Sequence, residues 1–337
     1  MKRRRNFSTG SAKFEPAKCL ALHNGSLLIL TLWLVTILSV LAVAIGRYLS
    51  LEVRLAKYRK AKEQAAALAR SGVYLAMQRV VRDAAAPEAG GRAYDWMGDE
   101  WAAPEAIATQ DEGSGAGGQL TVAIADEAGK LPLNTADQEQ LARLTGDELL
   151  AQRLVDARDP PDAPEDAPER TPPYFAKNAP FVAPEEVSDV PDMTPPLYDV
   201  LTTQTSPYAP AAEPMNLNTV SSEVLRAVGL SERAVQLVLQ YREGPDGPDA
   251  HEQDGVFQEG GVAILQTLKD QQGVDLTGTA DGNRLISSLF DVSSQTFTVV
   301  SEATLARPSV RVRVTAVIRR AGCPDNQPVC LVAWRES

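Results

Sequence analysis

One segment of the sequence, residues 26–45, contains twenty successive residues without a charge, and most of them are apolar. Twenty residues of α-helix rise about 30 Å, which matches the thickness of the hydrocarbon core of a bilayer. The alternatives are a buried core helix and a cleaved secretory signal, but the apolar region of such a signal is usually only about 7–15 residues long. We therefore expect a retained, single-pass transmembrane helix over residues 26–46.

The chain of 337 residues has a formal net charge of −11, and this charge is unevenly distributed. Residues 1–25 carry +5 and residues 47–82 carry +7, which leaves −23 for residues 83–337. The basic residues before the apolar segment predict a cytoplasmic N-terminus by the positive-inside rule. The acidic remainder argues against a nucleic-acid partner, because contacts to phosphates need clustered Lys and Arg.

Residue types that support catalysis are scarce. The chain has two histidines, His23 and His251, and three cysteines. Neither histidine lies in a motif that would support a Ser-His-Asp site or a zinc site. We therefore expect a protein that is not an enzyme.

The helical pattern continues beyond the membrane segment. Residues 47–83 contain no proline and one glycine, Gly72, and are rich in Ala, Leu, Lys, Arg and Gln, which favour helices. A helix over residues 26–82 would be about 85 Å long. An anchor does not need that length, so the pattern favours a helix that packs laterally against similar helices.

Two stretches, residues 133–159 and 217–243, match each other without a gap at an offset of 84 residues. Equivalent positions hold the same residue in pairs such as Arg158 and Arg242. In each stretch an Asn-Thr pair predicts a helix N-cap, and a central glycine predicts a turn between two helices. Each stretch is therefore a helix-hairpin-helix-like repeat. Such hairpins can bind DNA, but the acidic surroundings favour a structural or protein-docking role.

Alternating apolar and polar residues predict strands at 119–125, 310–318 and 329–334. Cys323 and Cys330 flank the turn between the last two strands, while Cys19 lies in the basic leader. In an oxidising compartment a disulfide across this hairpin is geometrically reasonable. The alternative is a pair of free thiols.

An acidic, proline-rich loop follows the first repeat. Its carboxylates include Asp156, Asp159, Glu165 and Asp166. Because Ca²⁺ takes about 6–8 oxygen ligands, the loop is a candidate Ca²⁺ site, although it lacks EF-hand spacing. The alternative is a solvated acidic loop. Residues 246–254 form a second, weaker candidate of the same kind.

Several segments together resemble one family, the minor pseudopilin K of the bacterial type II secretion system (general secretion pathway protein K). They are the leader that ends in Gly25, DEAGKLPLNT (126–135), LVDARD (154–159), PPYFAKNAPF (172–181), MNLNT (215–219) and the closing strands at 310–334. The resemblance implies an α+β pseudopilin fold, in which a long N-terminal transmembrane and amphipathic helix packs on a small antiparallel sheet. A large helical domain with the two repeats is inserted into that sheet.

The resemblance also implies a division of the chain into parts. These are a cytoplasmic prepilin-type leader (1–25), a transmembrane helix (26–46), its periplasmic continuation (47–83), a sheet region (84–132 and 291–337) and the inserted helical domain (133–290).

Processing and location follow from the same resemblance. Prepilin peptidase is expected to cleave after Gly25, so that Ser26 becomes the N-terminus of the mature chain and the site of methylation. Major pilins carry Glu at the fifth mature position, but here that position is Leu30. The pilin carboxylate is thought to neutralise the N-terminal amine of the next subunit up, so a subunit with nothing above it can tolerate Leu30.

The implied function is that of a minor pseudopilin in the bacterial inner membrane, with a periplasmic head. It stands at the tip of the pseudopilus and starts or caps its assembly with minor pseudopilins I and J, other pseudopilins and inner-membrane secretion components. The family binds calcium beside an Asp-rich loop, where Asp156, Asp159, Glu165 and Asp166 match and Ala157 departs from a commonly aromatic position. The alternatives are a membrane-anchored helix-hairpin-helix DNA-binding protein of a competence system and a type IV pilus minor pilin.

Overall fold

The computed structural model describes residues 24–85, 94–109, 117–159, 177–209, 213–244 and 255–337. Contacts divide the chain into two units, residues 1–58 and residues 59–337. Helix α1 (Asn24–Ala84) contributes residues to both units. The leader, residues 1–23, lies outside the described residues.

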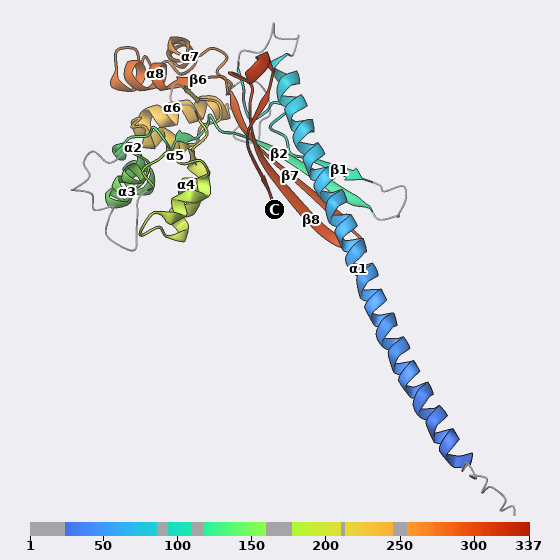
Figure 1. Cartoon of the computed structure of the whole chain (residues 1–337). Helices are drawn as coiled ribbons and strands as arrows, with labels where there is room; N and C mark the ends of the chain where they lie inside the picture. The colour runs from blue at the N-terminus through green and yellow to red at the C-terminus, as the bar shows by residue number, and fades with distance from the viewer. Residues whose placement is uncertain (1–23, 86–93, 110–116, 160–176, 210–212, 245–254) are drawn as a thin grey trace, which may run out of the picture. The chain divides into compact units, whose positions relative to one another are not determined.

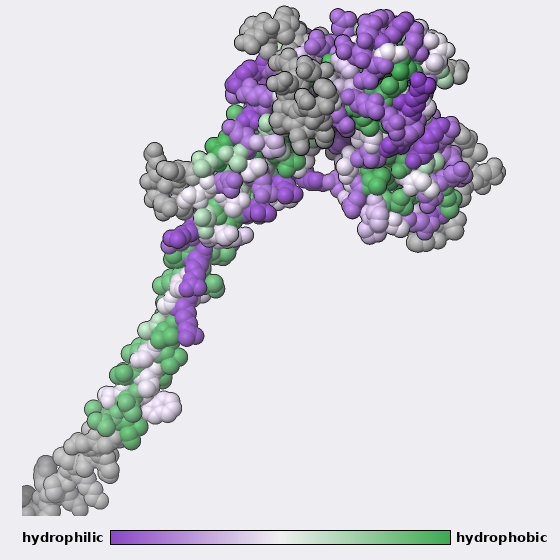
Figure 2. All heavy atoms as spheres, turned by 180° about the vertical axis from the view of Figure 1, so that it is seen from behind, coloured by the Kyte–Doolittle hydropathy of each residue, from purple (hydrophilic) through white to green (hydrophobic). Residues whose placement is uncertain are grey.

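In the first unit, α1 exposes large apolar side chains on all sides. Leu28 is 71% exposed and Trp33 is 65% exposed, and Figure 2 shows apolar surface along the visible face of this part of α1. By length and composition, α1 is the one helix in the described part of the chain that could cross a membrane. Burial in lipid would remove this surface from water.

In the second unit, α1 packs on a sheet through small side chains. Its buried positions recur at helical spacing and are mostly alanines: Ala61, Ala65, Ala66, Ala69, Val73, Ala76 and Val80. Small residues let the helix approach closely, and Gly72 lies at one such close contact. A Cβ atom there would lie 2.2 Å from Oγ of Ser301 and 3.0 Å from a methyl carbon of Val122.

The sheet has five antiparallel strands in the order β1-β2-β7-β8-β9 (Figure 1). They are β1 (Glu105–Thr109), β2 (Gly118–Asp126), β7 (Thr296–Ala306), β8 (Ser309–Arg319) and β9 (Cys330–Glu336). Strand β2 pairs directly with β7, so Asp126 lies opposite Phe297. All residues between these two strands form an insertion into the sheet. Trp101 fills the core at this end, with its ring 5.1 Å from that of Phe297.

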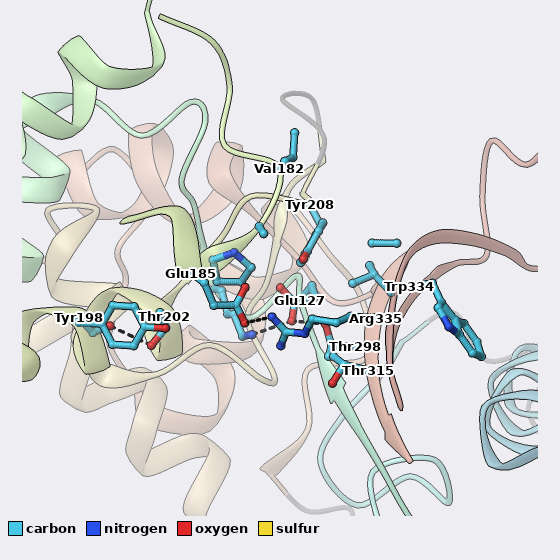
Figure 3. A pocket seen from close by; sticks show the side chains of 15 residues that line it. Glu127, Val182, Glu185, Tyr198, Thr202, Tyr208, Thr298, Thr315, Trp334 and Arg335 are labelled. Atoms are coloured by element: carbon cyan, nitrogen blue, oxygen red, sulfur yellow. Dashed lines mark hydrogen bonds and ion pairs between the residues drawn. The ribbon is translucent and has the colours of Figure 1, made fainter. Parts of the chain in front are cut away.

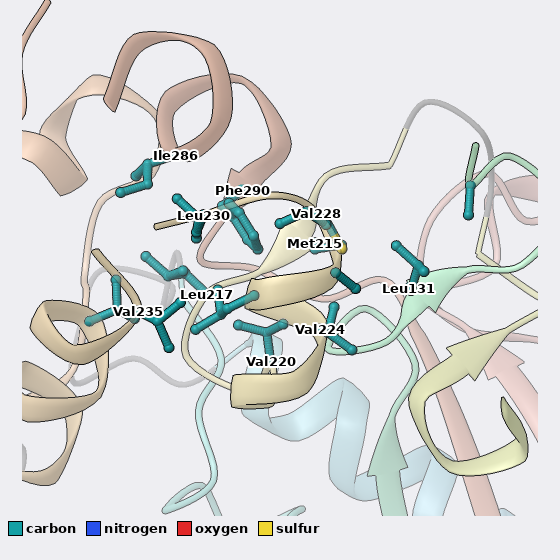
Figure 4. Close-up of a cluster of buried hydrophobic side chains, with 14 of the residues drawn as sticks. Leu131, Met215, Leu217, Val220, Val224, Val228, Leu230, Val235, Ile286 and Phe290 are labelled. Atoms are coloured by element: carbon teal, nitrogen blue, oxygen red, sulfur yellow. The ribbon is translucent and has the colours of Figure 1, made fainter. Parts of the chain in front are cut away.

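The insertion consists of two similar halves. The first contains β3 (Leu131–Pro132), α2 (Gln138–Thr145), α3 (Glu148–Arg158), the 3₁₀ helix η3 (Pro184–Asp189), α4 (Pro195–Gln204) and β4 (Thr205–Ser206). The second contains β5 (Met215–Asn216), α5 (Ser222–Ala227), α6 (Glu232–Glu243), α7 (Val262–Gln272), the π-helix η5 (Ala280–Ile286), α8 (Ser287–Leu289) and β6 (Phe290–Asp291). The halves share one hydrophobic core, part of which is shown in Figure 4.

The structural repeat is longer than the sequence repeat. Each half closes with a short parallel strand pair, β3 with β4 and β5 with β6. The amide of Leu133 donates to the carbonyl of Ser206, and the amide of Leu217 donates to that of Asp291, both at 2.8 Å. The helical hairpins found in the sequence are therefore the N-terminal parts of longer units, which begin at residues 131 and 215 and end at residues 206 and 291.

One expectation from the sequence is wrong. The Asn-Thr pairs do not cap helices: the N-caps are Asp137 and Ser221 for the first helix of each hairpin, because these residues directly precede the helices. Strand β1 was also not predicted, since EAIAT contains three residues that are poor or neutral strand formers. Its pairing with β2 decides its structure.

Candidate functional site

In each half of the insertion, one asparagine side chain forms two hydrogen bonds with the backbone of a residue far away in the sequence. Nδ2 of Asn218 donates to the carbonyl of Phe257, and the amide of Phe257 donates to Oδ1 of Asn218, both at 2.9 Å. Asn134 makes the same exchange with the backbone of Phe181, at 2.9 and 2.8 Å. An asparagine presents a donor and an acceptor together, which explains its place in both LNT motifs.

Repeated arginines add a second set of links. Arg158 donates to the carbonyl of Leu133 and Arg242 donates to that of Val220, both at 2.6 Å. Burial lowers the pKa of Arg242 to about 10. Each arginine therefore links the C-terminal end of its hairpin to the segment that precedes the hairpin.

A buried polar network joins the insertion to the sheet. Asp126, at the end of β2, accepts hydrogen bonds from the amide of Ala128 at 2.8 Å, from Oγ of Ser294 at 2.6 Å and from the hydroxyl of Thr219. Nδ2 of Asn216 donates to the same Ser294 hydroxyl at 2.7 Å. Burial raises the pKa of Asp126 to about 6, although these hydrogen bonds oppose the shift.

Asp95 belongs to the same junction. Its Oδ2 accepts from the amide of Ser294 at 2.7 Å and forms an ion pair with Arg320. Burial raises its pKa, and the charge of Arg320 lowers it in part. Asp83 and Asp99 offer oxygens within 4.8 Å of one from Asp95. Asp99 already accepts from the indole of Trp101 and the amide of Trp96, so its carboxylate is held by internal contacts.

The predicted calcium loop is described in part. Asp156 is half-buried, and Asp159 is exposed and forms an ion pair with Arg158 at 3.0 Å. Burial, and then the nearby charge of Asp159, raise the pKa of Asp156. Glu165 and Asp166 lie outside the described residues.

The side chain of Asn178 contacts the backbone of the same two aspartates. One polar atom of its side-chain amide lies 3.2 Å from the backbone oxygen of Asp159 and 3.3 Å from that of Asp156. Both neighbours are acceptors, so that atom is the amide nitrogen, and Nδ2 of Asn178 donates to both carbonyls. This contact links Asn178 to the end of α3.

The predicted processing site lies at the start of α1. Gly25 and Ser26 fall within the helix, and the side chain of Ser26 lies outside the described part of the structure. Leu30 lies on the same helix and is 70% exposed. In the second unit, Cys323 and Cys330 form a disulfide, with Cα atoms 5.6 Å apart, across the β8–β9 turn.

A cleft of about 530 Å³ separates the insertion from the sheet face opposite α1. In Figure 3, Arg335 of β9 points toward Glu185 of η3, with which it forms an ion pair, whereas Trp334 points away from them. Glu127 lines the cleft and accepts from Nζ of Lys130 at 2.6 Å and from the hydroxyl of Thr298 at 2.7 Å.

The sequence did not single out the junction residues. Asp95 and Asp126 are acidic residues beside turn-forming residues, where solvated carboxylates are common. One signal was available: Asp126 ends a strand and begins the DEAGKLPLNT segment on which the resemblance partly depends. Their burial depends on contacts with Asn216 and Ser294, which are far away in the sequence.

Comparison with known proteins identifies the fold. No family model and no curated protein matches the sequence. Among solved structures, a chain of the crystal structure of the GspK-GspI-GspJ complex from the enterotoxigenic Escherichia coli type 2 secretion system matches with a TM-score of 0.63. The match covers 84% of this chain and 99% of that chain at 17% sequence identity. The two chains share one fold. The predicted α+β pseudopilin fold, with its inserted helical domain, is therefore confirmed.

Proposed function

We propose that this chain is a minor pseudopilin of a type II secretion system that starts or caps the pseudopilus at its tip. The observation that carries the proposal is the insertion of two helical units between β2 and β7 of a sheet packed on α1. Over nearly its whole length, the GspK-GspI-GspJ chain has this fold. Subunit stacking depends on helices such as α1, and a large insertion on the head leaves little room for a subunit above it.

The proposed partners are minor pseudopilins I and J, followed by other pseudopilins and inner-membrane secretion components. The full chain should co-purify in detergent with the I and J proteins of the same organism, and deletion of its gene should stop pseudopilus assembly and secretion. Normal secretion and normal pilus number in the deletion strain would contradict the role. Loss of type IV pili with intact secretion would support the pilus alternative instead.

A DNA-binding role is the second candidate, because the insertion contains two helical hairpins. The hairpins pack against each other: Nη1 of Arg143 in α2 donates to the carbonyl of Ala227 in α5 at 3.1 Å. This contact uses a basic side chain and a hairpin turn that DNA binding would need. A gel-shift experiment with double-stranded DNA should show no complex with the full chain, and a salt-sensitive complex would support the alternative.

The proposed anchor is α1, with its N-terminus in the cytoplasm and the head in the periplasm. Prepilin peptidase would cleave after Gly25, and the amine of Ser26 would then be methylated. Intact-mass measurement should show loss of residues 1–25 together with one added methyl group. Gly25→Val should leave the leader in place, whereas Asn24→Ala serves as a matched control next to the cleavage site.

The proposed calcium site contains Asp156, Asp159, Glu165 and Asp166. Bound Ca²⁺ would neutralise the carboxylates and fix the loop after α3. Isothermal titration of the full chain with CaCl₂ should detect binding that Asp156→Asn removes. Absence of heat for the unaltered chain at millimolar Ca²⁺ would contradict the site.

A further inference from the structure

Strand β9 (Cys330–Glu336) is the last strand of the sheet, and in the described part of the chain it pairs only with β8. The amides and carbonyls of Ser337 and Arg313 are joined by two hydrogen bonds, at 2.9 and 3.0 Å. Antiparallel ladders alternate between bonded and non-bonded pairs. Arg335 and Ala333 therefore bond to β8, while the amides of Trp334 and Glu336 point away from the sheet.

One face of this edge is apolar. Trp334 lies opposite Ala316 and Leu331 lies opposite Ile318, and both partners belong to the core under α1. A bulge between Val317 and Ile318 places Trp334 and Leu331 on the same face in spite of their odd spacing. Yet Leu331 is 50% and Trp334 is 40% exposed. The apolar core face of the sheet is therefore still exposed at its β9 edge.

The surroundings of this face are also accessible. Arg70 of α1 forms an ion pair with Glu336 at 2.9 Å, which places this side of α1 along β9. Tyr74, one helical turn further on, is 65% exposed. The opposite edge differs: β1 is shorter, its Ile107 packs against the core, and its Glu105 is paired with Arg79. Exposed apolar edge strands are usually protected unless they bind something.

We propose that the β9 edge binds an extended segment of another protein, which adds a sixth, outermost strand to the sheet. The segment would alternate, with apolar side chains against Trp334 and Leu331 and polar side chains on the face of Arg335. Its backbone would bond to the outward groups of Trp334 and Glu336. The occupant is a segment with basic flanking residues, because residues 83–337 carry −23 and attract positive charge. The same charge disfavours a second copy of this chain, since two such heads repel each other.

Hydrogen exchange tests this directly, with the full chain in lipid nanodiscs. The probe is a short synthetic peptide of alternating valine and threonine between terminal lysines, and the control is the same peptide with a central proline. The alternating peptide should slow exchange of the Trp334 and Glu336 amides by about tenfold or more. The amides of Ala333 and Arg335 are already bonded, so they should change little. Protection elsewhere only, or no protection at either outward amide, overturns the proposal.

Three variants identify the contact. Trp334→Ala removes the side chain, and Trp334→Pro also removes an outward amide that the ladder with β8 does not use. Peptide affinity should fall with the first variant and fall further with the second. Ala333→Pro breaks the ladder itself and should unfold the edge. Equal affinity for all soluble variants would contradict strand addition. Concentration-dependent protection of both amides without peptide would show pairing with a second copy and would also overturn the proposal.

Discussion

Asn218 and Phe257 lie 39 residues apart and exchange two hydrogen bonds at 2.9 Å, so that one side chain fixes the backbone of a distant loop. Asn134 does the same for Phe181 at a separation of 47 residues. The two contacts are equivalent in the two halves of the insertion. They differ in burial, because Asn218 is 5% exposed and Asn134 is only half-buried.

Asn218→Ala should lower the free energy of unfolding by about 2–4 kcal/mol, because it leaves a buried amide and carbonyl of Phe257 without partners. Asn134→Ala should have a smaller effect, since water can reach that site. Urea denaturation of the detergent-solubilised chain measures both. Gln236→Ala, at an exposed position of α6, is the control and should change stability by less than about 0.5 kcal/mol. Equal losses at Asn134 and Asn218 would contradict the argument from burial.

Asp126 makes stability depend on pH. Burial raises the pKa of Asp126 from its ordinary value of 3.8 to about 6 in the folded chain, so between these values the folded state binds more protons than the unfolded state. Stability should therefore rise as pH falls from 7 toward 4, by up to about 3 kcal/mol from this residue. Asp126→Asn should remove that component, and the difference between the two unfolding curves measures it. Parallel curves for the two proteins between pH 4 and 7 would contradict the role of Asp126.

Gly72→Ala should destabilise the helix–sheet contact by about 1–3 kcal/mol, although alanine favours helices more than glycine does. The reason is the 2.2 Å approach of an added Cβ to Oγ of Ser301. That hydroxyl is buried and has no hydrogen-bond partner among the described residues, so Ser301→Ala alone should be nearly neutral. The double variant should recover much of the loss, as measured by a double-mutant cycle in thermal unfolding. Strict additivity of the two changes would show that the clash is not the cause.

Leu30→Glu restores the residue that major pilins carry at the fifth mature position. If no subunit docks above this one, secretion should continue with this variant. The introduced carboxylate would then have no N-terminal amine of another subunit to neutralise. A secretion assay in a complemented deletion strain measures this. Leu30→Lys serves as a charge control. Loss of secretion with Leu30→Glu but not with Leu30→Lys would contradict a position at the tip.

Local patterns were sufficient to predict much of the fold. Twenty uncharged residues indicate the start of α1, and alternation predicts β2, β8 and β9 within one or two residues. The sequence also shows the hairpins, because Arg158 and Arg242 recur at an offset of 84. When apolar residues recur at the regular spacing of a helix or strand, the sequence alone predicts which face of that element is buried.

Residues that act through distant partners were not predictable in this way. The role of Asn218 depends on Phe257, and that of Asp126 depends on Ser294 at a separation of 168 residues. A single sequence gives no measure of which distant segments meet, so both residues resemble ordinary turn residues. The same limit applies to Asn178, whose position beside Asp156 follows from the return of the chain after the acidic loop.

The direct pairing of β2 with β7 has a consequence for the order of folding. Glu127 and Thr298, which are joined by a hydrogen bond, are separated by 171 residues, and closing so long a loop is slow and entropically costly. Once the two halves of the insertion have folded, β4, β5 and β6 bring the chain back to the end of β2. We therefore expect the insertion to form first and to act as a template that brings β2 and β7 together.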